Sequence, residues 1–171
     1  MRRLGILLLS LIELASGPTG TRPQRLLETR QRIFQVAAGD PVQRALEKRA
    51  RLTVVYWPAV GRWVPCELPV RESLQSVSAA YPDIRILFIM PEAASGTTGK
   101  AQSTPPGEQV VLPSSEYSRQ ASWSPLPRVE AWTADGDLVL LKSIPQVLGN
   151  DGGLRSDVEG LRSLTAPLEE R

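Results

Sequence analysis

Two stretches of the chain are apolar at nearly every position: residues 52–57 read LTVVYW and residues 84–90 read IRILFIM. Apolar runs rich in β-branched and aromatic residues are typical of strands that are buried on both faces. Between them, Val70, Leu74 and Val77 repeat at helical spacing, which predicts an amphipathic helix from residue 66 or 67 to about 81. Strand, helix and strand together predict a right-handed βαβ unit.

The second half of the chain predicts a hairpin and a last helix. Residues 128–132 and 138–142 are apolar runs joined by a turn that contains Asp135-Gly136, which indicates an antiparallel pair. The long connection before them has a short apolar contact at 110–112 and a short helix near 115–121. A capping box from Ser156 to Glu159 predicts the start of the last helix. The expected architecture is an α/β protein with a mixed, four-stranded central sheet flanked by helices.

The N-terminal part predicts two helices. The first spans residues 24–38, and the second starts with Asp40 as N-cap and Pro41 in its first turn. Alternating charges within 44–49 are typical of a solvated helix face.

The first residues have the features of a secretory signal. Arg2 and Arg3 precede an apolar core at 4–12, and small residues follow at 15–17. The apolar stretch is shorter than the roughly 20 residues that cross a bilayer. An apolar helix packed on the domain is the alternative. We therefore divide the chain into a signal peptide or membrane anchor with linker (1–23), a helical extension (24–50) and a globular domain (51–171).

Composition removes most catalytic chemistries. The chain has no His and one Cys, which excludes Ser-His-Asp triads, His-ligated zinc or haem, an internal disulfide and a thiolate cluster. We therefore expect neither a metal nor a cofactor. Twenty basic and 18 acidic residues give a net charge of +2, so no nucleic-acid partner is expected.

Several short motifs resemble thioredoxin-like proteins. Residues 53–57 are similar to the strand that enters the active-site loop, and Trp63-Val-Pro65-Cys66 is similar to the CxPC motif, with Trp63 in place of its first Cys. Leu126-Pro127 resembles the family's cis-proline position, and Gly136 follows nine residues later in a hairpin turn. The resemblance implies a thioredoxin-like sandwich whose mixed sheet combines a parallel βαβ unit and a C-terminal hairpin.

The resemblance also implies a site and a function. Cys66 takes the catalytic position, and Trp63, Pro65, Pro127 and Arg128 take substrate-binding positions. The expected protein is an exported or periplasmic binding or accessory module in envelope thiol–disulfide chemistry. Its partner would be a protein carrying a thiol or disulfide. It would be free or membrane-anchored, with membrane contact only through the N-terminal segment.

An enzymatic function stays open in two forms. A lone Cys66 is able to exchange with an external disulfide. Alternatively, Trp57-Pro58 followed by Cys66 resembles the entry to a peroxiredoxin site, with Arg128 as its arginine and Trp63 in place of the usual hydroxyl residue. A helix start favours the thiolate, whereas burial beside Trp63 and the charge of Glu67 disfavour it. We expect a slow, largely protonated thiol at neutral pH.

Overall fold

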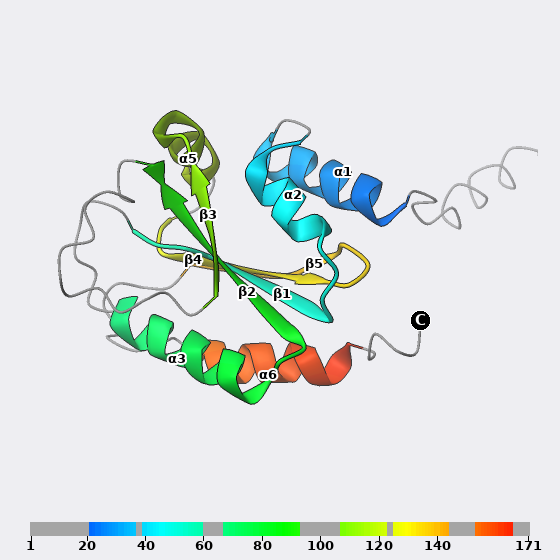
Figure 1. Ribbon diagram of the computed structural model, residues 1–171, viewed down its shortest axis with the longest axis vertical. Coiled ribbons are helices and arrows are strands. Elements are labelled where there is room, and N and C mark those ends of the chain that lie inside the picture. The colour runs from blue at the N-terminus through cyan, green and yellow to red at the C-terminus, as the bar shows by residue number, and fades with distance from the viewer. Residues whose placement is uncertain are drawn as a thin grey trace, which may run out of the picture.

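A five-stranded mixed sheet lies between two layers of helices (Figure 1). The computed structural model describes residues 21–36, 39–59, 67–92, 107–122, 125–143 and 153–165. The strands, in the sheet order β3-β2-β1-β4-β5, are β1 (Leu52–Trp57), β2 (Ile84–Pro91), β3 (Glu108–Leu112), β4 (Arg128–Thr133) and β5 (Leu138–Ser143). One face of the sheet carries α1 (Arg22–Phe34), α2 (Pro41–Glu47) and α5 (Ser114–Ala121); the other carries α3 (Glu67–Ala80) and α6 (Leu154–Leu164).

The strand pairing confirms the predicted α/β architecture. β1 and β2 are parallel neighbours, with Val54 opposite Ile86. β4 runs antiparallel to β1 on its other side and forms a hairpin with β5. The two apolar runs of the sequence are thus the two central strands, each with a neighbour on both sides.

The sheet has one strand more than the sequence predicted. β3 pairs in parallel with β2 at the edge of the sheet, with Val110 opposite Ile89. Its apolar signal is short because only Val110 and Leu112 are buried, while the strand begins with polar residues. Gly107, at φ +133°, leads into it: a Cβ atom there would lie 2.5 Å from the Ile86 carbonyl oxygen.

Helix ends differ from the predictions in two places. α1 ends at Phe34 rather than near residue 38, and Gln35 follows it in the left-handed conformation. The capping box at Ser156 is wrong: α6 already begins at Leu154, after Gly153 in the N-cap position. The predicted cap of α2 is confirmed, because the Asp40 carboxylate accepts hydrogen bonds from the next two free backbone N–H groups. Of the helices in these ranges, none is long and apolar enough to cross a membrane.

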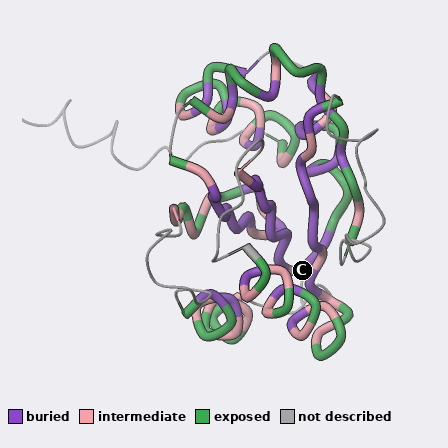
Figure 2. The backbone as a smooth tube through the Cα atoms, turned by 90° about the vertical axis from the view of Figure 1, so that its left-hand side faces the viewer, coloured by how far each residue is buried: buried purple, intermediate pink, exposed green. Residues whose placement is uncertain are grey.

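The N-terminal helices are built into the core. Leu26 and Phe34 of α1 and Leu46 of α2 are buried in one cluster with Trp57 and Trp132 of the sheet. Figure 2 shows the buried backbone running through the centre of the molecule, with exposed positions on the outer turns of the helices. The other face of the sheet forms a separate cluster with α3 and α6.

A buried ion pair joins the helices of the first layer. Arg30 of α1 is 1% exposed, and its Nη1 lies 2.6 Å from a carboxylate oxygen of Asp40, the cap of α2. Its Nη2 donates to the side-chain oxygen of Gln120 in α5 at 3.1 Å. Since a buried guanidinium needs partners for its charge and its donors, this arrangement fixes α1, α2 and α5 relative to one another.

Substituting Asp40 tests this pair. Asp40→Ala removes the cap of α2 and leaves the Arg30 charge buried without its carboxylate, so we expect the free energy of unfolding to fall by about 3–5 kcal/mol. The double variant Arg30→Met/Asp40→Asn keeps a capping oxygen and removes both charges; it should recover most of that loss. Urea denaturation followed by circular dichroism measures both. A double variant as unstable as the single one would contradict the buried-charge explanation.

The hairpin turn gives a second test. At Gly136, with φ +93°, an added Cβ would lie 2.8 Å from Cγ of Leu26 in α1. We expect Gly136→Ala to destabilise the fold by about 1–3 kcal/mol, through backbone strain and overpacking. The control is Gly160→Ala in α6, where an added Cβ meets nothing within 4 Å. It should be neutral or stabilise the fold by up to about 1 kcal/mol. Equal effects of the two substitutions would argue against the contact.

Candidate functional site

Three of the five residues singled out in the sequence, Trp63, Pro65 and Cys66, lie outside the described residues. The structure describes both flanks of their segment. β1 ends at Trp57, and α3 begins at Glu67, the residue that follows Cys66 in the sequence. Cys66, the only cysteine of the chain, therefore immediately precedes α3 in the sequence.

The other two residues, Pro127 and Arg128, lie at the end of β1. The Leu126–Pro127 peptide bond is cis, as expected from the resemblance, and Pro127 is buried. Arg128 is the first residue of β4 and pairs with Trp57, the last residue of β1. The proline turn is therefore beside the point where the chain leaves the sheet toward Cys66.

The first turn of α3 presents an apolar side chain to solvent. Leu68, two residues after Cys66 in the sequence, is 59% exposed, whereas Val70 and Leu74 of the same helix are fully buried in the core. In Figure 1 α3 starts on the side of the sheet toward which β1 and β2 run. An exposed leucine at a helix start is available to an apolar group of a partner.

Arg128 is enclosed by aromatic rings. Its side chain is fully buried, with the guanidinium carbon 4.7 Å from the ring centroid of Trp57 and 5.3 Å from that of Phe34. Its Nη2 donates to the backbone carbonyl of Gln120 at 3.2 Å. The sequence predicted Arg128 as a substrate-binding residue; in the structure its guanidinium contacts core groups of the protein itself. Cation–π contacts of this kind are strengthened by burial.

Glu130 provides the opposite charge. Its Oε1 lies 3.2 Å from Nε of Arg128, and its Oε2 accepts a hydrogen bond from the Trp132 indole at 3.1 Å. Burial raises the pKa of the Glu130 carboxyl above its ordinary value, and the charge of Arg128 opposes that rise. Burial also lowers the pKa of Arg128, against the effect of Glu130. The two groups form a buried ion pair at the start of β4, immediately after the proline turn in the sequence.

Sequence reasoning missed Glu130, although the strand carries its signal. Arg128, Glu130 and Trp132 alternate along β4, so they project to the same face of the sheet. A charged pair at positions i and i+2 of a strand that has neighbours on both sides predicts a buried ion pair. The sequence interpretation instead treated 128–132 as an apolar run.

α5 supports the same end of the sheet. The hydroxyl of Tyr117 donates to the carbonyl of Pro58, just beyond β1, at 2.5 Å. The ring of Tyr117 also lies against Trp57, with centroids 5.6 Å apart. Together with the bond from Arg128 to Gln120, these contacts hold the end of β1 and the start of β4 against one helix.

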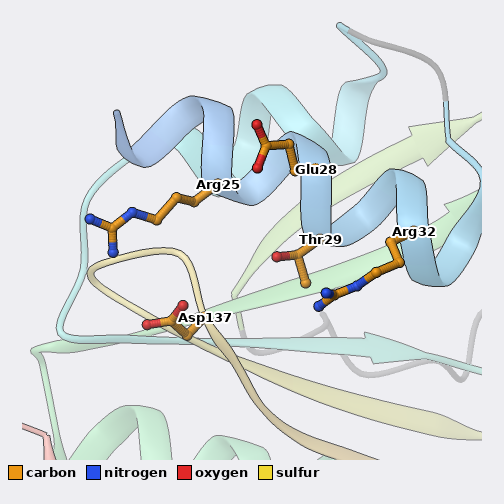
Figure 3. Close-up of a pocket in the computed structure, with 5 residues that line it drawn as sticks. All are labelled: Arg25, Glu28, Thr29, Arg32 and Asp137. Atoms are coloured by element: carbon orange, nitrogen blue, oxygen red, sulfur yellow. The ribbon is translucent and has the colours of Figure 1, made fainter. Parts of the chain in front are cut away.

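A separate polar hollow of about 340 Å³ lies between α1 and the β4–β5 turn (Figure 3). It is lined by Arg25, Glu28, Thr29 and Arg32 of α1 and by Asp137 of the turn. Pro127 and Arg128, the two predicted site residues that the structure describes, do not line it.

No protein-family model and no curated protein matches the sequence. Solved structures do match the fold. A hypothetical protein from Sinorhizobium meliloti has a TM-score of 0.50 at 13% identity, covering 71% of this chain and 74% of that one. A secreted Mycobacterium tuberculosis disulfide oxidoreductase homologous to E. coli DsbE has a TM-score of 0.49 at 16% identity, covering 69% and 86%. A thioredoxin-like protein from Porphyromonas gingivalis has a TM-score of 0.46 at 16% identity, covering 67% and 76%.

At sequence identities this low, the similarity indicates a shared fold and says nothing of function. The topology of this chain indicates the same fold: it has a parallel βαβ unit and a C-terminal hairpin whose first strand is antiparallel to β1. A cis-proline turn lies at the end of β1. This chain has the thioredoxin-like fold.

Proposed function

We propose that this protein is an exported thioredoxin-like module whose single thiol, Cys66, serves binding or accessory steps in envelope thiol–disulfide chemistry. The observation that supports this most is the position of the Leu126–Pro127 turn beside the end of β1, where the chain departs toward Cys66. In the family that the sequence resembles, this turn offers backbone groups to an extended partner chain.

One thiol permits a limited exchange reaction. The Cys66 thiolate attacks one sulfur of a partner disulfide; that S–S bond breaks, a mixed disulfide forms with Cys66, and the partner's second sulfur leaves as a thiolate. Since the chain has one Cys, no second thiol of its own resolves the mixed disulfide. A thiol from another protein or a small molecule has to release it. A long-lived mixed disulfide suits a module that holds a partner.

The described residues suggest how such a partner is met. Leu68 supplies an exposed apolar contact in the first turn of α3. Pro127 is buried, so under this proposal the backbone of its turn, and not its ring, meets the partner. We assign Trp63 and Pro65 to the same surface from the resemblance. Arg128 lies behind this surface, where its ring contacts and its pair with Glu130 hold the start of β4.

Turnover by Cys66 is the alternative function. Thiol–disulfide exchange with an external thiol needs no further group of this chain. A peroxiredoxin-like peroxidase needs a cation beside the reactive sulfur. Arg128 is the sequence candidate for that cation, and its burial between aromatic rings lends the peroxidase alternative no support.

A pair of turnover assays separates a binding module from an enzyme. We expect the wild-type protein to show no insulin reduction in the presence of an external thiol and no peroxide consumption. With an aromatic disulfide it should form one mixed disulfide per chain, detected by mass spectrometry and absent in Cys66→Ser. Turnover that is lost in Cys66→Ser would establish the enzyme instead.

The accessibility of the thiol is measured by alkylation. Because apolar residues precede Cys66 in the sequence and Glu67 follows it, we expect slow modification of the folded protein by iodoacetamide at neutral pH, speeding up as the pH rises. Trp63→Ala should accelerate the reaction, whereas the control Trp63→Phe, which keeps an aromatic ring at this position, should accelerate it less. Rapid modification near pH 6 would contradict a protonated, covered thiol.

A further inference from the structure

β3 forms one edge of the sheet, and an open hollow of about 300 Å³ lies beside it. In the sheet order β3 has β2 on one side and, within the part of the chain that the structure describes, no strand on the other. An edge strand carries backbone N–H and C=O groups that no neighbouring strand uses, so it is able to pair with a strand of another chain. The hollow is lined by Glu108, Gln109, Val110 and Val111 of β3 and by Pro41, Arg44, Ala45 and Lys48 of α2.

The two faces of β3 differ in character. Val110 and Leu112 are buried in the cluster that includes α2. Val111 alternates with them and therefore lies on the opposite face, where it is 41% exposed. A strand added beside β3 would place every second side chain next to α2 and the others next to Val111.

The α2 side of the hollow carries an excess of positive charge. Glu108 is paired with two cations, Lys48 at 2.8 Å and Arg85. Hydrogen bonds from these two cations hold the pKa of the Glu108 carboxyl below its ordinary value, so it stays ionised at neutral pH. Arg44, one helical turn before Lys48, is exposed, and none of the described carboxylates forms an ion pair with it. Three cations and one carboxylate leave a net charge of +2 beside β3.

We propose that the edge of β3 binds an extended protein segment in which acidic and apolar side chains alternate. The segment adds a sixth strand to the sheet through its backbone hydrogen bonds. Its acidic side chains meet Arg44 and Lys48 on the α2 side, and its apolar side chains pack on Val111 on the other side. A second copy of this chain fits less well, because pairing of two β3 strands would bring two cationic α2 helices to the same edge.

This inference goes beyond the proposed thiol chemistry and does not rest on it. Cys66 precedes α3 in the sequence, and α3 covers the face of the sheet opposite to α2. Cys66→Ser should therefore leave peptide binding unchanged, and a failure of peptide binding would leave the thiol chemistry as proposed.

NMR titration of the isotope-labelled full chain tests the proposal. The probe is a blocked peptide containing Glu-Val-Glu-Val-Glu; the control peptide contains Glu-Glu-Glu-Val-Val, which has the same composition and charge without the alternation. Both are titrated into the wild-type protein and into Arg44→Gln and Val111→Ser.

Each test variant has a matched control. Arg32→Gln removes another exposed arginine, which lines the separate hollow beside α1. Val139→Ser changes a valine that is 38% exposed on β5, the opposite edge strand. Circular dichroism verifies that all four variants are folded.

We expect the alternating peptide to shift the backbone amide signals of β3 and α2 saturably, and the control peptide to bind about tenfold more weakly. Arg44→Gln and Val111→Ser should each raise the dissociation constant of the alternating peptide roughly fivefold, and the two control variants by less than about twofold.

Several results would overturn the proposal. These are the absence of saturable shifts at β3, equal affinity for the two peptides, and equal effects of the test and control variants. A dimer detected by sedimentation and lost in Val111→Ser would also overturn it, because the edge would then belong to a second copy of the chain.

Discussion

The first layer of this protein is organised by two buried guanidinium groups. Arg30 and Arg128 are both essentially inaccessible to solvent, and each is matched by one carboxylate, Asp40 and Glu130. Burying a charge without partners costs far more free energy than one packing contact provides. Moving α1, α2 or α5 away from these positions would separate Arg30 from Asp40 or Gln120, or Arg128 from Gln120, so the two guanidinium groups restrict how the helices pack.

Gln120 of α5 connects these two groups. Its side-chain oxygen accepts from Arg30, and its backbone carbonyl accepts from Arg128. A polar path thus runs from the cap of α2, through α1 and α5, to the first residue after the proline turn. The N-terminal extension is consequently part of what holds the candidate site, although it is remote from that site in the sequence. Phe34 strengthens this link, because its ring covers the guanidinium of Arg128.

The sequence predicted the elements whose signals are local. The two central strands, the hairpin and the Asp40 cap follow from apolar runs, an Asp-Gly turn and a capping residue, each of which acts within a few positions. β3 was missed as a strand because it is an edge strand with two buried residues, so its pattern is too short to detect. The capping box at Ser156 was wrong because the helix starts two residues before the motif, at Leu154, with Gly153 in the N-cap position.

The candidate site was predictable only in part. The proline turn followed from its resemblance to a known motif, whereas the environment of Arg128 depends on residues far apart in the chain. Phe34, Trp57 and Gln120 meet its guanidinium only when two helices and two strands are packed together. The spacing of Glu130 and Arg128, two positions apart on a strand, indicates that both lie on the same face of the sheet. It does not indicate which helix covers that face.

The guanidinium of Arg22, at the very start of α1, has a consequence for how much of the N-terminus the fold can lose. It donates to the backbone carbonyls of Leu46 and Glu47, each at 2.7 Å, and to that of Ala134 in the hairpin turn. One side chain therefore joins the beginning of the fold to the end of α2 and to a turn more than a hundred residues later. A chain cut by proteolysis on the C-terminal side of Arg22 would lose this three-way attachment, and the exposed end of α1 would become a starting point for further degradation.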